Sequence, residues 1–312
     1  MPSLRIRLIA GLAAAALVAA ACSSTSPSPT AEPSSMAEPS FDPVSVEPSA
    51  SASIHEDEPA IFFTAASATI TVDGDSSDWS AIEGATLNME QLRLENLPPE
   101  VAAEIDFGPL DPIDVTFKVA TDAENIYVLL EVPGGFTYNP ADHNLSAAVA
   151  VQFSIDDPAA PHMGAEEPDL DTSLGTVDIW HWELDCAPGA ASGGGTGTGD
   201  DPECNLDDEY ATRPEVREDD GGGDLVNADA ENSLSGVWEH SARASGAGAD
   251  GTWIFEFSRP LQTGDPQDAQ FASGGTAYVA LAYWDPTEGP EGWSDAGHLQ
   301  SAYNGWIEVT LP

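Results

Sequence analysis

The chain has 312 residues, of which 8 are Lys or Arg and 54 are Asp or Glu, giving a formal net charge of −46. Such a surface repels nucleic-acid phosphates and anionic lipid headgroups, so both are poor binding partners. The carboxylates are spread along the whole chain, as is typical of adaptation to a salty medium that screens their repulsion. Steering of a basic redox partner is the alternative explanation.

The first residues have the pattern of an export signal. Two arginines precede an apolar run from Leu8 to Ala21, which is short for a membrane span and has no charged stop behind it. The run Val18-Ala-Ala-Ala-Cys22 resembles a bacterial lipobox, in which Cys22 is lipidated and becomes the new N-terminus. Residues 1–22 therefore predict an extracytoplasmic lipoprotein, at the cell surface or in the periplasm, that meets the membrane only through its lipid anchor. An ordinary signal cleaved near Ala21 is the alternative.

Residues 23–60 are mostly Ser, Pro, Thr, Ala and Glu, so a disordered, extended tether is expected. This leaves residues 61–312 for one folded domain. Export also sets the redox compartment. Cys186 and Cys204 are the remaining cysteines, and an even pair in an oxidising compartment is expected to form a disulfide, which for this loop length stabilises by roughly 3 kcal/mol.

The body of the chain alternates β-branched and aromatic runs with Gly, Pro and Asp. Several runs are apolar at consecutive positions, which suits strands buried on both faces. Only residues 98–105 favour a short helix. The expected fold class is all-β, an antiparallel β-sandwich with long loops. The expected strands are residues 68–72, 115–120, 125–132, 147–155, 177–182, 253–257, 277–284 and 305–311.

Asp73-Gly-Asp-Ser-Ser-Asp-Trp79 places three carboxylates close together, which invites a calcium site. The segment lacks the distal bidentate glutamate of an EF-hand loop, however. The same run is the strand–turn–Trp entrance of sandwich domains such as the family-9 carbohydrate-binding modules, where Asp and Gly form the turn. The turn is the preferred interpretation.

A series of short motifs occurs in a fixed order along residues 66–312: Asp73-Gly-x-x-x-Asp-Trp79, Met163-Gly164, Ile179-Trp-His-Trp182, Phe257-Ser-Arg-Pro-Leu261 and Tyr283-Trp-Asp285. In this order they resemble the haem-binding domain family of the ethylbenzene dehydrogenase gamma subunit, cytochrome c-552 and the DMSO reductase-like proteins. The resemblance implies a haem-binding sandwich similar to family-9 carbohydrate-binding modules and DOMON domains. It also implies haem b, single-electron transfer, and a molybdenum oxidoreductase or a cytochrome as redox partner.

The resemblance maps one axial iron ligand onto Met163. The second ligand in the family is a lysine well downstream, whereas the only lysine here, Lys118, lies upstream on an expected strand. Histidine is the obvious substitute, and His240 is the first choice because it precedes the Trp253 strand, near where the downstream ligand is expected. The other histidines considered are His181, His298 and His162.

Two further features bear on a haem pocket. His181 projects from its strand on the face opposite Trp180 and Trp182, so either the histidine or the tryptophans face the pocket. Arg259 is a candidate to pair with a haem propionate, with a structural salt bridge as the alternative. The candidate lining residues, for which core packing is an equal explanation, are Trp180, Trp182, Trp238 and Tyr283.

No pattern in the sequence indicates catalysis. The chain has no Gly-x-Ser-x-Gly, no His-Glu-x-x-His and no phosphate-binding Gly loop. It also lacks Cys-x-x-Cys-His, which excludes covalently attached c-type haem. The sequence therefore predicts a non-enzyme: a lipid-anchored cytochrome of b type. The alternatives are a carbohydrate-binding-type β-sandwich lipoprotein without haem and a substrate-capture or structural lipoprotein.

Overall fold

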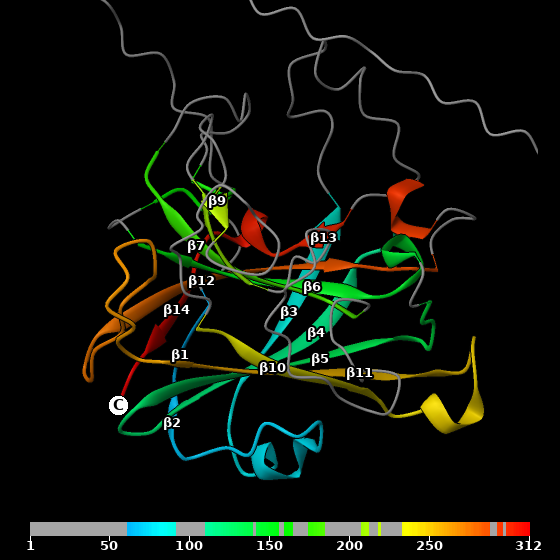
Figure 1. The fold of residues 1–312 in the computed structure, drawn as a ribbon, viewed down its shortest axis with the longest axis horizontal. Coiled ribbons are helices and arrows are strands. Elements are labelled where there is room, and N and C mark those ends of the chain that lie inside the picture. The colour runs from blue at the N-terminus through cyan, green and yellow to red at the C-terminus, as the bar shows by residue number, and fades with distance from the viewer. Residues whose placement is uncertain are drawn as a thin grey trace, which may run out of the picture. The chain divides into compact units, whose positions relative to one another are not determined.

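Strands dominate the computed structural model of the protein (Figure 1). The residues it describes are 61–91, 110–139, 142–155, 159–164, 174–184, 207–211, 218–219, 233–287, 292–295 and 298–312. The expected signal, tether and lipidation site, the short helix at 98–105 and the Cys186–Cys204 bridge lie outside these residues.

The strands form two layers. One layer, sheet B, has the order β10-β11-β5-β4-β3, with β2 beside β4. Its strands are β2 (Ala66–Ser67), β3 (Ala85–Gln91), β4 (Ile113–Thr121), β5 (Asn125–Gly135), β10 (Ser235–His240) and β11 (Asp250–Pro260). The other layer, sheet A, has the order β13-β12-β6-β7-β8-β9, with β14 also on β12 and β1 on β14. Its strands are β1 (Phe62–Thr64), β6 (Ala148–Ser154), β7 (Val177–Glu183), β8 (Asp207–Ala211), β9 (Glu218–Asp219), β12 (Thr276–Trp284), β13 (Leu299–Gln300) and β14 (Ile307–Thr310).

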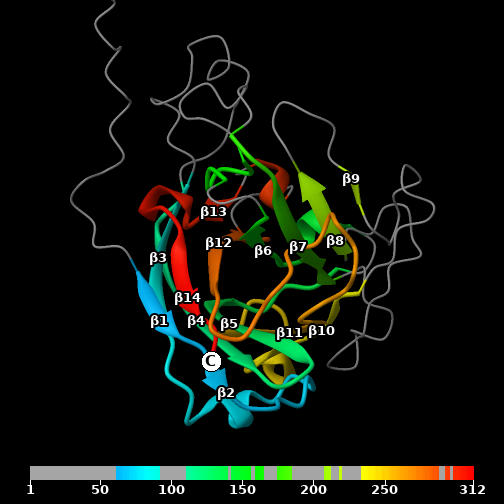
Figure 2. The ribbon, with the colours of Figure 1, turned by 90° about the vertical axis from the view of Figure 1, so that its left-hand side faces the viewer.

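The expected antiparallel β-sandwich is confirmed. Figure 2 shows β12, β6, β7 and β8 as one layer over β5, β11 and β10 as the other. The pairings are antiparallel except for two short N-terminal strands, because β1 pairs β14 and β2 pairs β4 in parallel. At one edge β13 pairs both β12 and β3, so the two layers share a continuous ladder there.

The main core lies between the layers, because alternate side chains of each sheet point inward. Sheet B contributes β4, β5 and β11 residues such as Phe117, Leu130 and Phe255, and sheet A contributes residues such as Val151 and Trp182. In a strand with one buried face, buried and exposed side chains alternate. In β5 and β6, by contrast, both faces are buried, as their consecutive apolar residues predict.

The outer face of sheet B is covered by the segment that precedes β3. Outside sheet B, Trp79 and Ile70 pack on Tyr127 and Leu129 of β5. The segment 68–72, expected to be a strand, lies in this cover and is not part of a ladder. The Ala68 amide donates to the Thr121 carbonyl at 3.0 Å, whereas the Thr71 amide donates to the Asp78 carboxylate at 3.1 Å.

Glu256 explains the position of the aspartate-rich turn. This fully buried β11 carboxylate accepts the indole N–H of Trp79 at 2.8 Å and the backbone amides of Asp73 and Gly74. Within the turn, Asp73 and Asp75 accept amide hydrogen bonds from residues two positions on. The carboxylates therefore serve the turn, as the preferred interpretation expected.

Replacing Glu256 with Gln is expected to lower the free energy of unfolding by about 1–3 kcal/mol near pH 6, because one acceptor oxygen becomes a donor facing buried N–H groups. Burial raises the pKa of Glu256 above its ordinary 4.5. The wild-type carboxyl therefore contributes most to stability below pH 4.5, and this contribution falls as pH rises through the folded-state pKa. The difference in unfolding free energy between the wild type and the Gln variant should therefore narrow at higher pH. Urea unfolding across pH measures both effects.

Glu308→Gln is the matched control, because Glu308 is an exposed residue of strand β14. It should change stability by less than about 0.5 kcal/mol. Equal effects of the two substitutions would show that the Glu256 contacts contribute nothing specific.

The helical elements are short. Those described are turns of 3₁₀ helix, such as η1 (Ser76–Trp79), η3 (His143–Leu145), η6 (Arg243–Ser245), η7 (Gly292–Asp295) and η8 (Ala302–Asn304). Within the described part of the chain, no helix has the length and apolar character needed to cross a membrane.

Candidate functional site

The outer face of sheet A brings together the methionine and three of the histidines considered as ligands. The floor of this face consists of small side chains, because β6 and β12 place Ala150 and Ala282 opposite each other. His181 of β7 continues the same row, paired with Ala150. A smaller hydrophobic cluster covers this floor, separate from the main core.

Met163 belongs to this cluster and is held in an unusual backbone conformation. Its φ is 52°, the left-handed region, and it is the one non-glycine residue with positive φ in the described ranges. A left-handed residue with a Cβ costs about 1–2 kcal/mol, and such strain concentrates at functional sites. Gly164 follows with φ 70°, and its carbonyl accepts the Leu174 amide at 2.7 Å. The Met-Gly pair is therefore a fixed turn.

The segment that carries Met163 is fastened to the sheet by side chains. Gln152 of β6 donates from Nε2 to the carbonyl of Pro161 at 3.0 Å. The indole of Trp306 donates to the carbonyl of Ala159 at 2.7 Å. Met163 and Trp306 both pack on the same apolar cluster, together with Trp284. These bonds position the methionine over the outer face.

Trp284, the last residue of β12, is the centre of an aromatic group. Its ring lies 5.0 Å from the His181 ring and 4.9 Å from the His298 ring, centroid to centroid. Trp293 lies 6.2 Å away on its own element, η7. Burial, followed by the charges of His181 and His162, lowers the pKa of His298 from 6.5 to about 4. The His298 imidazole is therefore neutral at neutral pH.

His162 completes the group. Its ring lies 5.0 Å from that of Tyr303, in η8. His162 directly precedes Met163, which packs on the same cluster as Trp284, and the His298 ring lies against Trp284, so all three lie on one side of sheet A. Three of the four histidines considered as ligands therefore lie on the same side of sheet A as Met163.

His240, the first choice from the sequence, lies in a different cluster. Its ring packs on Phe136 and Trp253 at the edge of the main core, with centroids 5.3 and 4.5 Å away. Nε2 lies 3.1 Å from the carbonyl oxygen of Gly134, and Nδ1 accepts the Ala242 amide at 3.1 Å. Backbone groups therefore occupy both ring nitrogens, and iron binding by His240 would require breaking one of these bonds.

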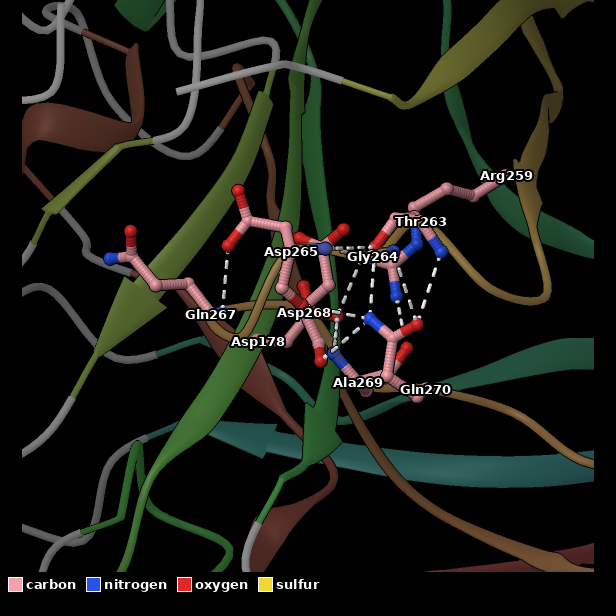
Figure 3. Close-up of polar contacts among 9 residues, drawn as sticks. All are labelled: Asp178, Arg259, Thr263, Gly264, Asp265, Gln267, Asp268, Ala269 and Gln270. Carbon is pink, nitrogen blue, oxygen red and sulfur yellow. Dashed lines mark hydrogen bonds and ion pairs between the residues drawn. The ribbon is translucent and has the colours of Figure 1, made fainter. Parts of the chain in front are cut away.

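Arg259 makes a structural salt bridge across the sandwich (Figure 3). Its Nη1 lies 2.6 Å from Oδ2 of Asp178 on β7 and 3.6 Å from Oδ1 of Asp268. Nη2 donates to the Ala269 carbonyl at 2.6 Å, and the guanidinium lies 4.9 Å from the centre of the Trp180 ring. Arg259 is fully buried, so this geometry supports the structural role rather than a propionate contact.

The candidate lining residues Trp180, Trp182, Trp238 and Tyr283 all belong to the main core. His181 lies on the opposite face of β7 from the two tryptophans beside it, as alternation predicted. Lys118 donates from Nζ to the Trp79 carbonyl at 3.0 Å, in the other sheet. Its position gives no support to a lysine ligand.

No preformed metal site accompanies these features. In the ranges that the structure describes, no three His, Cys, Asp or Glu side chains are arranged to hold a metal ion. The donors near Met163 suit a metal that needs only two protein ligands, as iron in a porphyrin does. Trp284 was not predicted from the sequence as a residue of the site, although it is part of the motif Tyr283-Trp-Asp285.

The fold defines an all-β sandwich with a donor-bearing outer face, and one family model matches within it. The model of the ethylbenzene dehydrogenase family matches residues 239–296, which include β11 and β12. No relative was found among curated proteins. The match ends two residues before His298.

Solved structures of similar shape include carbohydrate-binding proteins. The family-9 module from Caldicellulosiruptor kristjanssonii in complex with glucose is 10% identical over 80% of this chain and 95% of that chain, with a TM-score of 0.40. The same module with cellotriose is 11% identical over 80% and 92%, with a TM-score of 0.38. A putative carbohydrate-binding protein from Bacteroides uniformis is 10% identical over 81% and 100%, with a TM-score of 0.44. Similarity at this level carries no functional argument.

Proposed function

We propose that this protein is an extracytoplasmic, b-haem-binding electron-transfer protein without catalytic activity of its own. One observation carries the proposal: a thioether and neighbouring imidazoles gather on one sheet face, in a chain whose residues 239–296 match the ethylbenzene dehydrogenase family. Haem bound there would supply a one-electron redox centre whose potential a thioether ligand keeps fairly high.

The residues of the outer face fit that group in three respects. Met163 provides a soft sulfur donor in a turn fixed by hydrogen bonds. The small side chains of Ala150 and Ala282 form the floor of this face, and Met163, Trp284 and Trp306 pack on the same cluster around it. Trp284 and Trp306 add apolar area that keeps water from the iron.

The anchor and the partner complete the proposal. Lipidation at Cys22 would hold the protein at the membrane, and a molybdenum oxidoreductase or a cytochrome would exchange electrons with it. The strongly negative chain suits a basic docking surface on such a partner. A disulfide between Cys186 and Cys204 belongs to the same oxidising location.

Haem loading tests the cofactor directly. The full mature chain, purified without haem and titrated with hemin in high salt, is expected to bind about one equivalent and to show a low-spin spectrum with sharp bands after reduction. Bovine serum albumin at the same concentration serves as a control for unspecific hemin uptake. A spectrum no different from free hemin would contradict the proposal.

A carbohydrate-binding function is the second candidate. It is favoured by three partly buried tryptophans, Trp284, Trp293 and Trp306, since indole rings stack on sugar rings. Glucose and cellotriose are suitable probes for calorimetry. Saturable sugar binding by a protein that takes up no haem would put this function first.

A further inference from the structure

His298 differs from His240 in what its ring nitrogens do. Within the described part of the chain, His298 makes no hydrogen bond; its ring packs against that of Trp284, and the charges of His181 and His162 act on it. Both nitrogens of His240 are taken by backbone groups. His240 and His298 both follow Met163 in the sequence. Of these two, only His298 has a ring nitrogen whose lone pair is open to a ligand.

The strand register places His298 on the same face as Met163. In the antiparallel pair β12–β13, Ala282 lies opposite Gln300 and Tyr283 opposite Leu299, so the next step sets Trp284 beside His298. Trp284 and Ala282 are two positions apart on β12 and share one face. Across the sheet, Ala282 is paired with Ala150 and Ala150 with His181, so the three share the outer face of sheet A. Met163 packs on this face.

We propose that His298 supplies the second axial ligand, with Met163, to a haem b held against the outer face of sheet A. The proposal rests on the haem-binding function proposed above and names the residue that replaces the lysine of the related family. Trp284 then acts as a positioning residue, because its ring packs against the His298 imidazole and fixes where it points. Gln152 positions Met163 in the same way, through its bond to Pro161.

The central test removes the imidazole and then returns it. Reconstituted His298→Ala is expected to lose the low-spin spectrum almost completely and to become high-spin, because one axial position is left to water. Added imidazole should restore low-spin bands by filling that position. His298→Lys should stay low-spin, with an amine in place of the imidazole. Magnetic circular dichroism of the ferric protein then distinguishes these ligands.

Methionine ligation has its own signature. The weak near-infrared charge-transfer band of a thioether on ferric haem should be present in the wild type and absent in Met163→Ala. The Met163→Ala variant should also show a lower reduction potential, since the soft sulfur favours ferrous iron. Near-ultraviolet circular dichroism of each haem-free variant checks that its tertiary packing is intact.

Two further variants test whether another histidine is the axial ligand. His240→Asn keeps an acceptor close to the position of Nδ1 and should leave the low-spin spectrum unchanged. If His298 is the ligand, His181→Ala should only shift the bands slightly, through the contact of His181 with Trp284, and should leave the iron low-spin.

The outcomes separate the two proposals. A wild type that takes up no haem contradicts the proposed function. A wild type with low-spin haem whose His298→Ala variant has the same spectrum overturns the ligand assignment alone, and so does conversion to high spin by His181→Ala or His240→Asn. If His298→Ala fails to fold, His298→Lys decides: an unchanged imidazole signature in that variant overturns the assignment.

Discussion

Arg259→Ala is expected to lower the free energy of unfolding by about 3–5 kcal/mol, because breaking a buried ion pair from one side leaves an uncompensated charge in the interior. Arg259 lies between the sheets, and its side chain and that of its partner Asp178 are both buried. Asp178 also accepts the Ala269 amide at 2.8 Å, so one carboxylate ties β7, β11 and the loop 261–270 together. Without the guanidinium, Asp178 and Asp268 would lie near each other without their shared cation.

Urea unfolding followed by tryptophan fluorescence measures this loss. Arg243→Ala is the matched control, since Arg243 pairs with Glu239 at 3.6 Å near the surface. Pairs of that kind contribute about 0.2–1 kcal/mol. The double variant Arg259→Met, Asp178→Leu should be more stable than Arg259→Ala, because it removes a buried charge together with its partner. A loss at Arg259 no larger than at Arg243 would contradict the structural role.

The sequence predicted the strands whose residues are strongly apolar. The segments that became β4, β5, β6 and β12 are rich in Val, Ala and aromatic residues, and their burial on one or both faces follows from that composition. Strand β3 was not expected, because its sequence Ala-Thr-Leu-Asn-Met-Glu-Gln is half polar. Its alternation of buried Leu87 and Met89 with exposed neighbours is the signal that was available.

The partners of the buried polar residues could not be predicted in the same way. Arg259 pairs with a carboxylate 81 positions away, and Glu256 receives a tryptophan N–H from 177 positions away. With 54 acidic residues in the chain, nothing local marks Asp178 as the partner of Arg259. Such contacts depend on which strands become neighbours, which the order β11-β5-β4 and the stacking of the sheets decide.

The sequence alone could not rank the histidines as ligands, for a related reason. His240 was preferred because it lies close in sequence to the Trp253 strand, and the structure does pair it with Trp253 in β10–β11. That register places its ring against the main core. His298 reaches the Met163 face through β13, a strand of two residues that is too short to have a sequence period.

High salt is expected to stabilise the fold by several kcal/mol. At −46 the net charge is far from zero, and two like charges about 10 Å apart in water repel by about 0.4 kcal/mol, so dozens of such pairs oppose the compact state strongly. Raising salt from 0.1 to 1 M shortens the Debye length from about 10 to about 3 Å and removes most of this repulsion. The melting temperature should rise by roughly 2–4 °C for each kcal/mol gained.

The shape of the salt dependence identifies the cause. Screening is nearly complete by about 1 M, so a gain from screening should level off there. A gain from preferential exclusion of salt would continue to grow, and more steeply with sulfate than with chloride. Differential scanning calorimetry in NaCl, in Na₂SO₄ of equal ionic strength and in sucrose separates the two. A melting temperature that is unchanged between 0.1 and 1 M NaCl would show that the carboxylates do not destabilise the fold, and steering of a basic partner would then be the better account of the acidic composition.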